Sequence, residues 1–280
     1  MTPAFRPIAL LLLLSWLAVP AALVPPAAAQ APSTWDAIQE RGSLRIGATQ
    51  APPWYLKDPQ SGDWSGLGIA VGRAMAETLG AELEVVEVTW GNAIAALQAD
   101  KIDVMFVLDA TPERAMAVDF PAAPLLYYAL AVIVADDVTV ETWEDLNKPE
   151  VTIAVTQGTT IDSYVSAHCP NAEILRFPTN SENVAAFQSG RADAASLFHP
   201  PLIALQKQMG KGKIVLPQPI RASASSAAVR READKTWRDW VSTAIAYYYE
   251  TNQTQVWYEE FLASFGVDPA ATPPIRKELW

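Results

Sequence analysis

The sequence predicts an α/β protein of two lobes, each built on a mostly parallel sheet flanked by helices. Segments that favour strands alternate with segments that favour helices along most of the chain, which is typical of a parallel, doubly wound architecture. A short segment at 95–103 has a close counterpart at 185–193. The length of 280 residues leaves room for two domains.

The repeated segment carries most of this prediction. Ala-Ala-Leu-Gln-Ala-Asp-Lys-Ile-Asp at 95–103 and Ala-Ala-Phe-Gln-Ser-Gly-Arg-Ala-Asp at 185–193 both run on into apolar residues. Each copy has the pattern of a helix end, a polar corner and a strand buried on both faces. A β-rich stretch precedes each copy, at 83–88 and at 172–177. Unrelated helix–turn–strand units also resemble one another, but we favour two lobes of similar build with a cleft between them.

Residues 1–29 have the pattern of a secretory signal peptide. Arg6 precedes an apolar run at 8–19, and small residues follow up to Ala29. A membrane anchor is the alternative, but the apolar run is shorter than the roughly 20 residues that a span needs. Cys is absent near the cleavage position, so a lipid anchor is not expected. We expect export to the periplasm, with cleavage near Ala29.

Composition excludes several classes of function. The formal net charge of −11 argues against nucleic acid or an anionic membrane as the partner. Cys169 is the only cysteine, which rules out an intramolecular disulfide. The two histidines, His168 and His199, are too few for a structural zinc site. We expect both to be ordinary surface or cleft residues, and we expect no metal or cofactor.

The first half of the chain has clear element signals. A proline-rich loop at 51–55 excludes helix, and a helix with apolar residues at three- and four-residue spacing stops at Gly80. Thr111-Pro112-Glu113-Arg114 is a helix start, with a cap, a proline at the first helical position and an acid in the first turn. The remaining expectations are a helix at 34–40, a strand at 44–48, a turn at 58–63, and a strand at 125–134 that crosses between the lobes.

The second half repeats the alternation. A strand at 151–155 leads into Gln157-Gly158-Thr159-Thr160 and a helix from Ile161. After the second copy of the repeat, the chain returns to the first lobe through 223–230. The other expected elements are a helix at 200–209, a strand at 213–216, and closing helices at about 232–250 and 253–264.

Several short motifs follow one another in a fixed order. They include Leu44-Arg45-Ile46-Gly47, Thr111-Pro112-Glu113-Arg114, Gln157-Gly158-Thr159-Thr160, Gly190-Arg191-Ala192-Asp193 and Trp257-Tyr258-Glu259-Glu260-Phe261. Their series over 43–265 resembles the periplasmic solute-binding proteins of amino-acid ABC transporters, the bacterial extracellular solute-binding proteins of family 3. The resemblance implies two lobes joined by two crossing strands, with a ligand in the cleft. The first lobe would comprise 43–128 plus 223–280, and the second 129–222.

The resemblance implies that Arg114 binds the carboxylate of the ligand. The chemistry agrees, because a guanidinium matches a carboxylate bidentately and stays charged. Gly158, Thr159 and Thr160 would face the same group from the second lobe, where a helix N-terminus offers free amides and hydroxyls. The alternatives are a solvated or ion-paired Arg114 and simple helix capping by Thr159. Contacts from both lobes would let a ligand favour the closed state.

Aromatic residues are the expected contacts of the ligand side chain. Trp90 falls where the family often has an aromatic or apolar residue, although a core tryptophan under a loop is the alternative. Trp54 is a weaker candidate, as is Tyr55, because aromatic residues of a proline loop often pack internally.

Two positions depart from the family. Phe198 stands where an acid usually pairs with the α-ammonium of the ligand, and Asp109 stands where a Ser or Thr often holds the carboxylate. One interpretation is that Asp109, Trp90 and Phe198 form a partly aromatic cage for an amine. The other is a carboxylate ligand that lacks an amine. The sequence leaves both open.

The function that the resemblance implies is the binding component of an ABC importer, acting as a monomer that delivers a small solute to a membrane permease. A periplasmic sensor with the same ligand site is an alternative. A dehydratase is another, since cyclohexadienyl dehydratases share this fold. Those enzymes need a catalytic acid near 198–201, where this chain offers only His199 as a proton donor.

Overall fold

The computed structural model describes residues 32–279. The predicted signal peptide, residues 1–29, lies outside this range. Residues from Pro32 onward form one compact unit. None of the helices in the described range combines the length and the apolar character that a membrane span needs.

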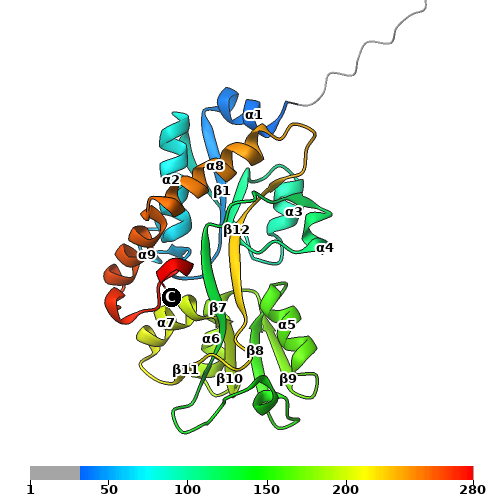
Figure 1. Cartoon of the computed structure of the whole chain (residues 1–280), viewed down its shortest axis with the longest axis vertical. Coiled ribbons are helices and arrows are strands. Elements are labelled where there is room, and N and C mark those ends of the chain that lie inside the picture. Colours follow the sequence, from blue (N-terminus) through cyan, green and yellow to red (C-terminus); the bar gives the residue numbers. More distant parts are fainter. Residues whose placement is uncertain (1–31, 280) are drawn as a thin grey trace, which may run out of the picture. The chain divides into compact units, whose positions relative to one another are not determined.

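Within residues 32–279, ten strands form one sheet, and β7 and β12 run side by side through its middle (Figure 1). Eight strands follow the order β4-β1-β5-β12-β7-β10-β8-β9, while β11 pairs with β7 and β6 with β12. The strands are β1 (Ser43–Ala48), β4 (Glu82–Glu87), β5 (Val104–Leu108), β6 (Val118–Asp119), β7 (Leu126–Val134), β8 (Thr152–Thr156), β9 (Glu173–Phe177), β10 (Ala194–Phe198), β11 (Lys213–Val215) and β12 (Ala222–Arg230). A separate hairpin joins β2 (Leu56–Lys57) to β3 (Trp64–Ser65).

The strand directions define two lobes. In the first lobe β1 lies parallel between β4 and β5, and in the second lobe β8 lies parallel between β9 and β10. β7 and β12 pair with each other through 126–129 and 222–225. Beyond that stretch β12 continues along β5, whereas β7 continues along β10. Both strands therefore cross from one lobe to the other, as predicted.

Helices pack on both parallel sets. In the first lobe they are α1 (Thr34–Arg41), α2 (Leu67–Leu79), α3 (Ala93–Gln98), α4 (Pro112–Ala115), α8 (Thr236–Glu250) and α9 (Gln253–Ser264). In the second lobe they are α5 (Thr160–His168), α6 (Asn180–Gln188) and α7 (His199–Met209). Short 3-10 turns occur at Trp143–Leu146, Pro269–Ala271 and Lys277–Leu279. The sequence did not predict these turns or the short strands β2, β3 and β6.

The helix that was predicted to start at 111–114 is short, and the start of one closing helix differs from the prediction by about four residues. α4 is a single turn, because the chain at once enters β6, where Val118 pairs with Arg230. α8 begins at Thr236 instead of about 232. The carboxylate of Glu232 accepts a hydrogen bond from the Thr34 amide at 3.1 Å, and Asp234 accepts one from the Thr236 amide at 2.8 Å. The long-range bond holds Glu232 against α1, and the local bond from Asp234 satisfies the amide of Thr236 at the helix start.

The two copies of the repeated segment fold alike. Each corner contains one residue in the left-handed region, Asp100 with φ 55° in the first copy and Gly190 with φ 74° in the second. The last aspartate of each copy then binds the neighbouring parallel strand. The Asp103 carboxylate accepts the Arg45 amide and the Asp193 carboxylate accepts the Thr152 amide, both at 2.8 Å. The repeat therefore marks the same helix–turn–strand unit in each lobe.

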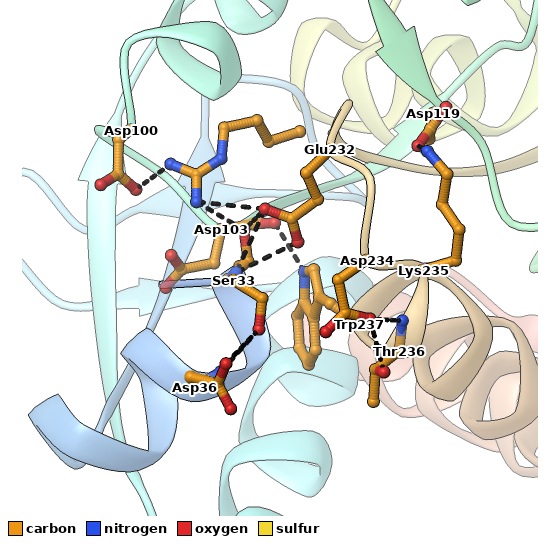
Figure 2. Close-up of polar contacts among 12 residues, drawn as sticks. Ser33, Asp36, Asp100, Asp103, Asp119, Glu232, Asp234, Lys235, Thr236 and Trp237 are labelled. Carbon is orange, nitrogen blue, oxygen red and sulfur yellow. Dashed lines mark hydrogen bonds and ion pairs between the residues drawn. The ribbon is translucent and has the colours of Figure 1, made fainter. Parts of the chain in front are cut away.

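The first copy adds a cluster of charges, part of which appears in Figure 2. The fully buried Asp103 carboxylate pairs with Arg41 and with Arg45, each at 2.6 Å. The hydrogen bond to Asp103 raises the pKa of Arg45. The Trp237 indole donates to the Asp103 carbonyl at 2.9 Å. This cluster joins α1, β1, β5 and α8, and thus holds the terminal helices on the sheet of the first lobe.

Candidate functional site

A cavity of about 40 Å³ lies between the two lobes. It has room for only a few water molecules. Its walls come from loops and strand ends of both lobes, including the end of β5, the crossing strand β7, the start of α5 and the end of β10. Seven of the eight residues predicted to bind a ligand line it: Trp54, Trp90, Asp109, Arg114, Thr159, Thr160 and Phe198. Gly158, the eighth, touches the cavity lining through its carbonyl, which accepts a bond from Arg114.

Arg114 reaches the cavity from α4. The Thr111 hydroxyl accepts the Arg114 amide at 3.2 Å and so starts the helical turn that aims this side chain. The guanidinium donates to the carbonyls of Asp109 and Gly158, both at 2.9 Å. Among residues 32–279, no carboxylate lies within ion-pair distance of it. Burial lowers the pKa of Arg114. Arg114 is thus a desolvated cation with donors to spare and no anionic partner.

The start of α5 faces Arg114 from the second lobe. Thr159 donates to the Thr156 carbonyl at 2.7 Å and caps the helix by accepting the Asp162 amide at 3.2 Å. Thr160 instead directs its hydroxyl across the cleft to Asp109. Thr159 is therefore a capping residue, and Thr160 contributes a donor that bridges the lobes.

Gly158 makes a close approach that only glycine permits. Its φ of 73° lies in the left-handed region. A Cβ at this position would stand 3.0 Å from the Cα of Gly91, which follows β4 in the first lobe. The backbones of the two lobes thus meet here without side chains between them.

Three hydroxyl groups donate hydrogen bonds to the Asp109 carboxylate. One carboxylate oxygen accepts bonds from Tyr128 and, at 3.0 Å, from Ser225; the other accepts the bond from Thr160. Burial, reinforced by the charge of Asp109, raises the pKa of Tyr128, so this phenol stays protonated as a donor. Tyr128 and Ser225 escaped the sequence analysis because each is an ordinary strand residue of β7 or β12.

Aromatic rings form the opposite wall. Phe198 is 7% exposed, and its ring stacks on Tyr128 with centroids 3.6 Å apart. The ring centroids of Trp54 and Tyr128 lie 6.2 Å apart, and those of Trp90 and Tyr55 lie 6.1 Å apart. Tyr55 packs internally, as expected, and donates to the Phe106 carbonyl at 3.0 Å. Trp54 is also almost wholly buried but retains a face on the cavity.

His199 differs from the expectation of a surface or cleft residue, because it is only 4% exposed. Its Nδ1 accepts the Ala129 amide at 3.1 Å, which leaves the proton on Nε2. Burial lowers the pKa of His199 to about 4. The imidazole is therefore neutral at neutral pH and is fixed against the crossing strand β7.

Comparison with known proteins agrees with this architecture. Residues 44–264 match the bacterial extracellular solute-binding proteins, family 3. The chain belongs to this family. Cyclohexadienyl dehydratase of Pseudomonas aeruginosa is 29% identical over 192 residues, which are 63% of this chain and 70% of that protein. The L-cystine-binding protein TcyJ of Escherichia coli is 21% identical over 234 residues, 82% of this chain and 85% of that protein.

Among solved structures, the chain resembles AncCDT-1, described as an ancestral amino acid-binding protein and a precursor of cyclohexadienyl dehydratase. The TM-score is 0.71 at 31% identity, with 83% of this chain and 99% of that chain covered. The predicted family and the predicted fold class are both confirmed. The relatives include periplasmic binding proteins as well as one enzyme, so membership of the family leaves two kinds of activity to weigh.

Proposed function

We propose that this chain is the binding component of an ABC importer, which captures a small solute bearing a carboxylate and delivers it to a membrane permease. One observation carries the proposal: Arg114 of the first lobe and the start of α5 in the second face one cavity, and the cation lacks an anionic partner among the described residues. A carboxylate there would receive a charged donor from the first lobe and neutral hydroxyl and amide donors from the second. Several relatives named as binding proteins of amino-acid ABC transporters support the importer.

Other parts of the proposal concern location and build. The protein would be exported to the periplasm with cleavage near Ala29 and would act as a monomer. The lobe boundaries would be 43–128 plus 223–280 for the first lobe and 129–222 for the second. The pairing of β7 with β12 at 126–129 and 222–225 supports a hinge close to these boundaries.

Substitution of Arg114 tests the site. Arg114→Ala should cost roughly 2–5 kcal/mol of affinity for a carboxylate, the range for removing one partner of a buried charged pair. Arg114→Lys should recover only part of this loss, because the planar fork is gone. Isothermal titration calorimetry measures both variants, with the exposed Arg191→Ala as control. If Arg114→Ala binds with unchanged affinity, the ligand must bind at another site.

Dehydration is the second candidate, favoured by the relative from Pseudomonas aeruginosa. Two features support binding over catalysis: Phe198 offers no proton, and His199 is buried beneath the backbone of β7. Incubation with a cyclohexadienyl substrate, followed by the absorbance of an aromatic product, separates the two functions. Formation of product above the uncatalysed rate would replace the binding proposal.

A further inference from the structure

The charged groups of the cavity indicate a class of ligand. Resting on the proposed function, we infer that the ligand is a carboxylate without an ammonium group, such as a 2-oxo acid. Phe198 and Asp109 allowed two interpretations from sequence: an amine held in an aromatic cage, or an acid that lacks an amine. The structure favours the acid.

Asp109, the acid of the cavity, already accepts hydrogen bonds from three hydroxyl groups of the protein. Asp109 is the one carboxylate among the described lining residues, and its two oxygens accept from Tyr128, Ser225 and Thr160. The oxygen that accepts from Tyr128 and Ser225 already has two donors, so an ammonium on that oxygen would displace one of them. The Tyr128 hydroxyl is buried and would then lack a partner, which costs free energy. Asp109 therefore serves the hydroxyl groups of the protein.

The end of β10 gives the cavity an aromatic wall. The ring of Phe198, stacked on Tyr128, offers no acceptor to an ammonium. The same stack gives an apolar, flat surface to the body of a ligand. An ammonium buried there without a partner would carry a large desolvation cost, whereas a carbonyl or a methylene would not.

A groove beside the cavity carries more positive than negative charge. This groove of about 600 Å³ adjoins the cavity at Arg114, Thr159 and Thr160, and Arg221 lines it as well. The one acid among its described lining residues is the exposed Glu113. On a chain with a net charge of −11, such a groove attracts anions locally. The groove thus favours an anion, and it leads to the cavity at Arg114.

Matched pairs of ligands test the inference directly. Wild-type protein is titrated by calorimetry with alanine and pyruvate, valine and 2-oxoisovalerate, and phenylalanine and phenylpyruvate. At least one oxo acid should bind about tenfold or more tightly than its amino acid, since tenfold corresponds to only about 1.4 kcal/mol. Tighter binding of the amino acid in every pair that binds would overturn the inference and leave the proposed function standing. Lack of binding by both members of all pairs would overturn both.

Two variants of one residue isolate the role of Phe198. Phe198→Asp restores an acid at the end of β10, and Phe198→Asn removes the ring to the same extent without adding charge. The ratio of amino-acid to oxo-acid affinity should rise about tenfold or more in Phe198→Asp relative to Phe198→Asn. Equal ratios in the two folded variants would contradict the inference. If either variant melts early, the wild-type pairs still decide the question.

Discussion

Asp103 and Asp193 stand at the same position of the repeated segment but have different surroundings. Both carboxylates accept an amide of the adjacent parallel strand. The Asp103 carboxylate is also fully buried and holds Arg41 and Arg45, whereas Asp193 is exposed. The first lobe thus adds two charged pairs to a bond that the second lobe makes alone.

The two aspartates allow a matched test of this difference. Asp103→Ala leaves Arg41 without its acid and Arg45 with only the exposed Asp100, and it should lower the free energy of unfolding by about 3–5 kcal/mol. Asp193→Ala loses a single hydrogen bond and should cost about 1 kcal/mol. Urea denaturation followed by circular dichroism measures both. Equal losses would mean that the charged pairs of Asp103 add nothing to the shared bond.

The contacts of single side chains were the feature that the sequence predicted least completely. The sequence indicated seven of the fourteen described residues that line the cavity, among them Arg114 and Thr160, because these lie at helix starts with clear local signals. It could not predict what Asp109 binds, since its donors Tyr128 and Ser225 lie on two strands that meet only in the folded chain. The role of Asp109 therefore depended on tertiary structure.

At the scale of elements, local signals predicted most helices and strands. Threonine caps begin α4, α5 and α6, and each hydroxyl accepts the amide three residues later at 3.2 Å. Elements shaped by distant partners were missed or misplaced. β6 exists because Val118 pairs with Arg230, and α8 starts late because Glu232 binds Thr34. Neither partner lies close in sequence.

Two glycines offer a test of how the lobes meet. Gly158 and Gly190 have φ values of 73° and 74°, so alanine at either position should cost a similar backbone strain of about 1–2 kcal/mol. A Cβ at Gly158 would press on Gly91 of the other lobe, whereas nothing lies within 4 Å of one at Gly190. Only Gly158→Ala should therefore weaken ligand binding, by about tenfold or more.

Calorimetry with the tightest-binding carboxylate gives the affinities, and urea denaturation gives the strain. Gly190→Ala is the control for the backbone, because it keeps the same conformation at a site remote from the cavity. Equal affinities for the two variants would show that the contact of Gly158 with Gly91 does not control ligand binding.

At the scale of the molecule, the repeat and the alternation of elements predicted two lobes and two crossing strands. They could not predict how closely the lobes approach each other. In this structure Thr160 bonds Asp109 and Arg114 bonds the Gly158 carbonyl across the cleft. These contacts leave a cavity of about 40 Å³, which is too small for an amino or oxo acid. A ligand must therefore enter through a more open arrangement.

Closure of the lobes desolvates Arg114 at a cost in free energy that the charge of Asp109 offsets only in part. An open arrangement would return Arg114 to water, and a bound carboxylate would stabilise the closed arrangement. The ligand should therefore shift the population from the open to the closed state. Small-angle X-ray scattering should then show a smaller radius of gyration with a binding carboxylate than without one. Gly158→Ala should lose this compaction and Gly190→Ala should retain it. An identical radius with and without ligand in the wild type would mean that the lobes are rigid, and that entry requires only side-chain motion around the crossing strands.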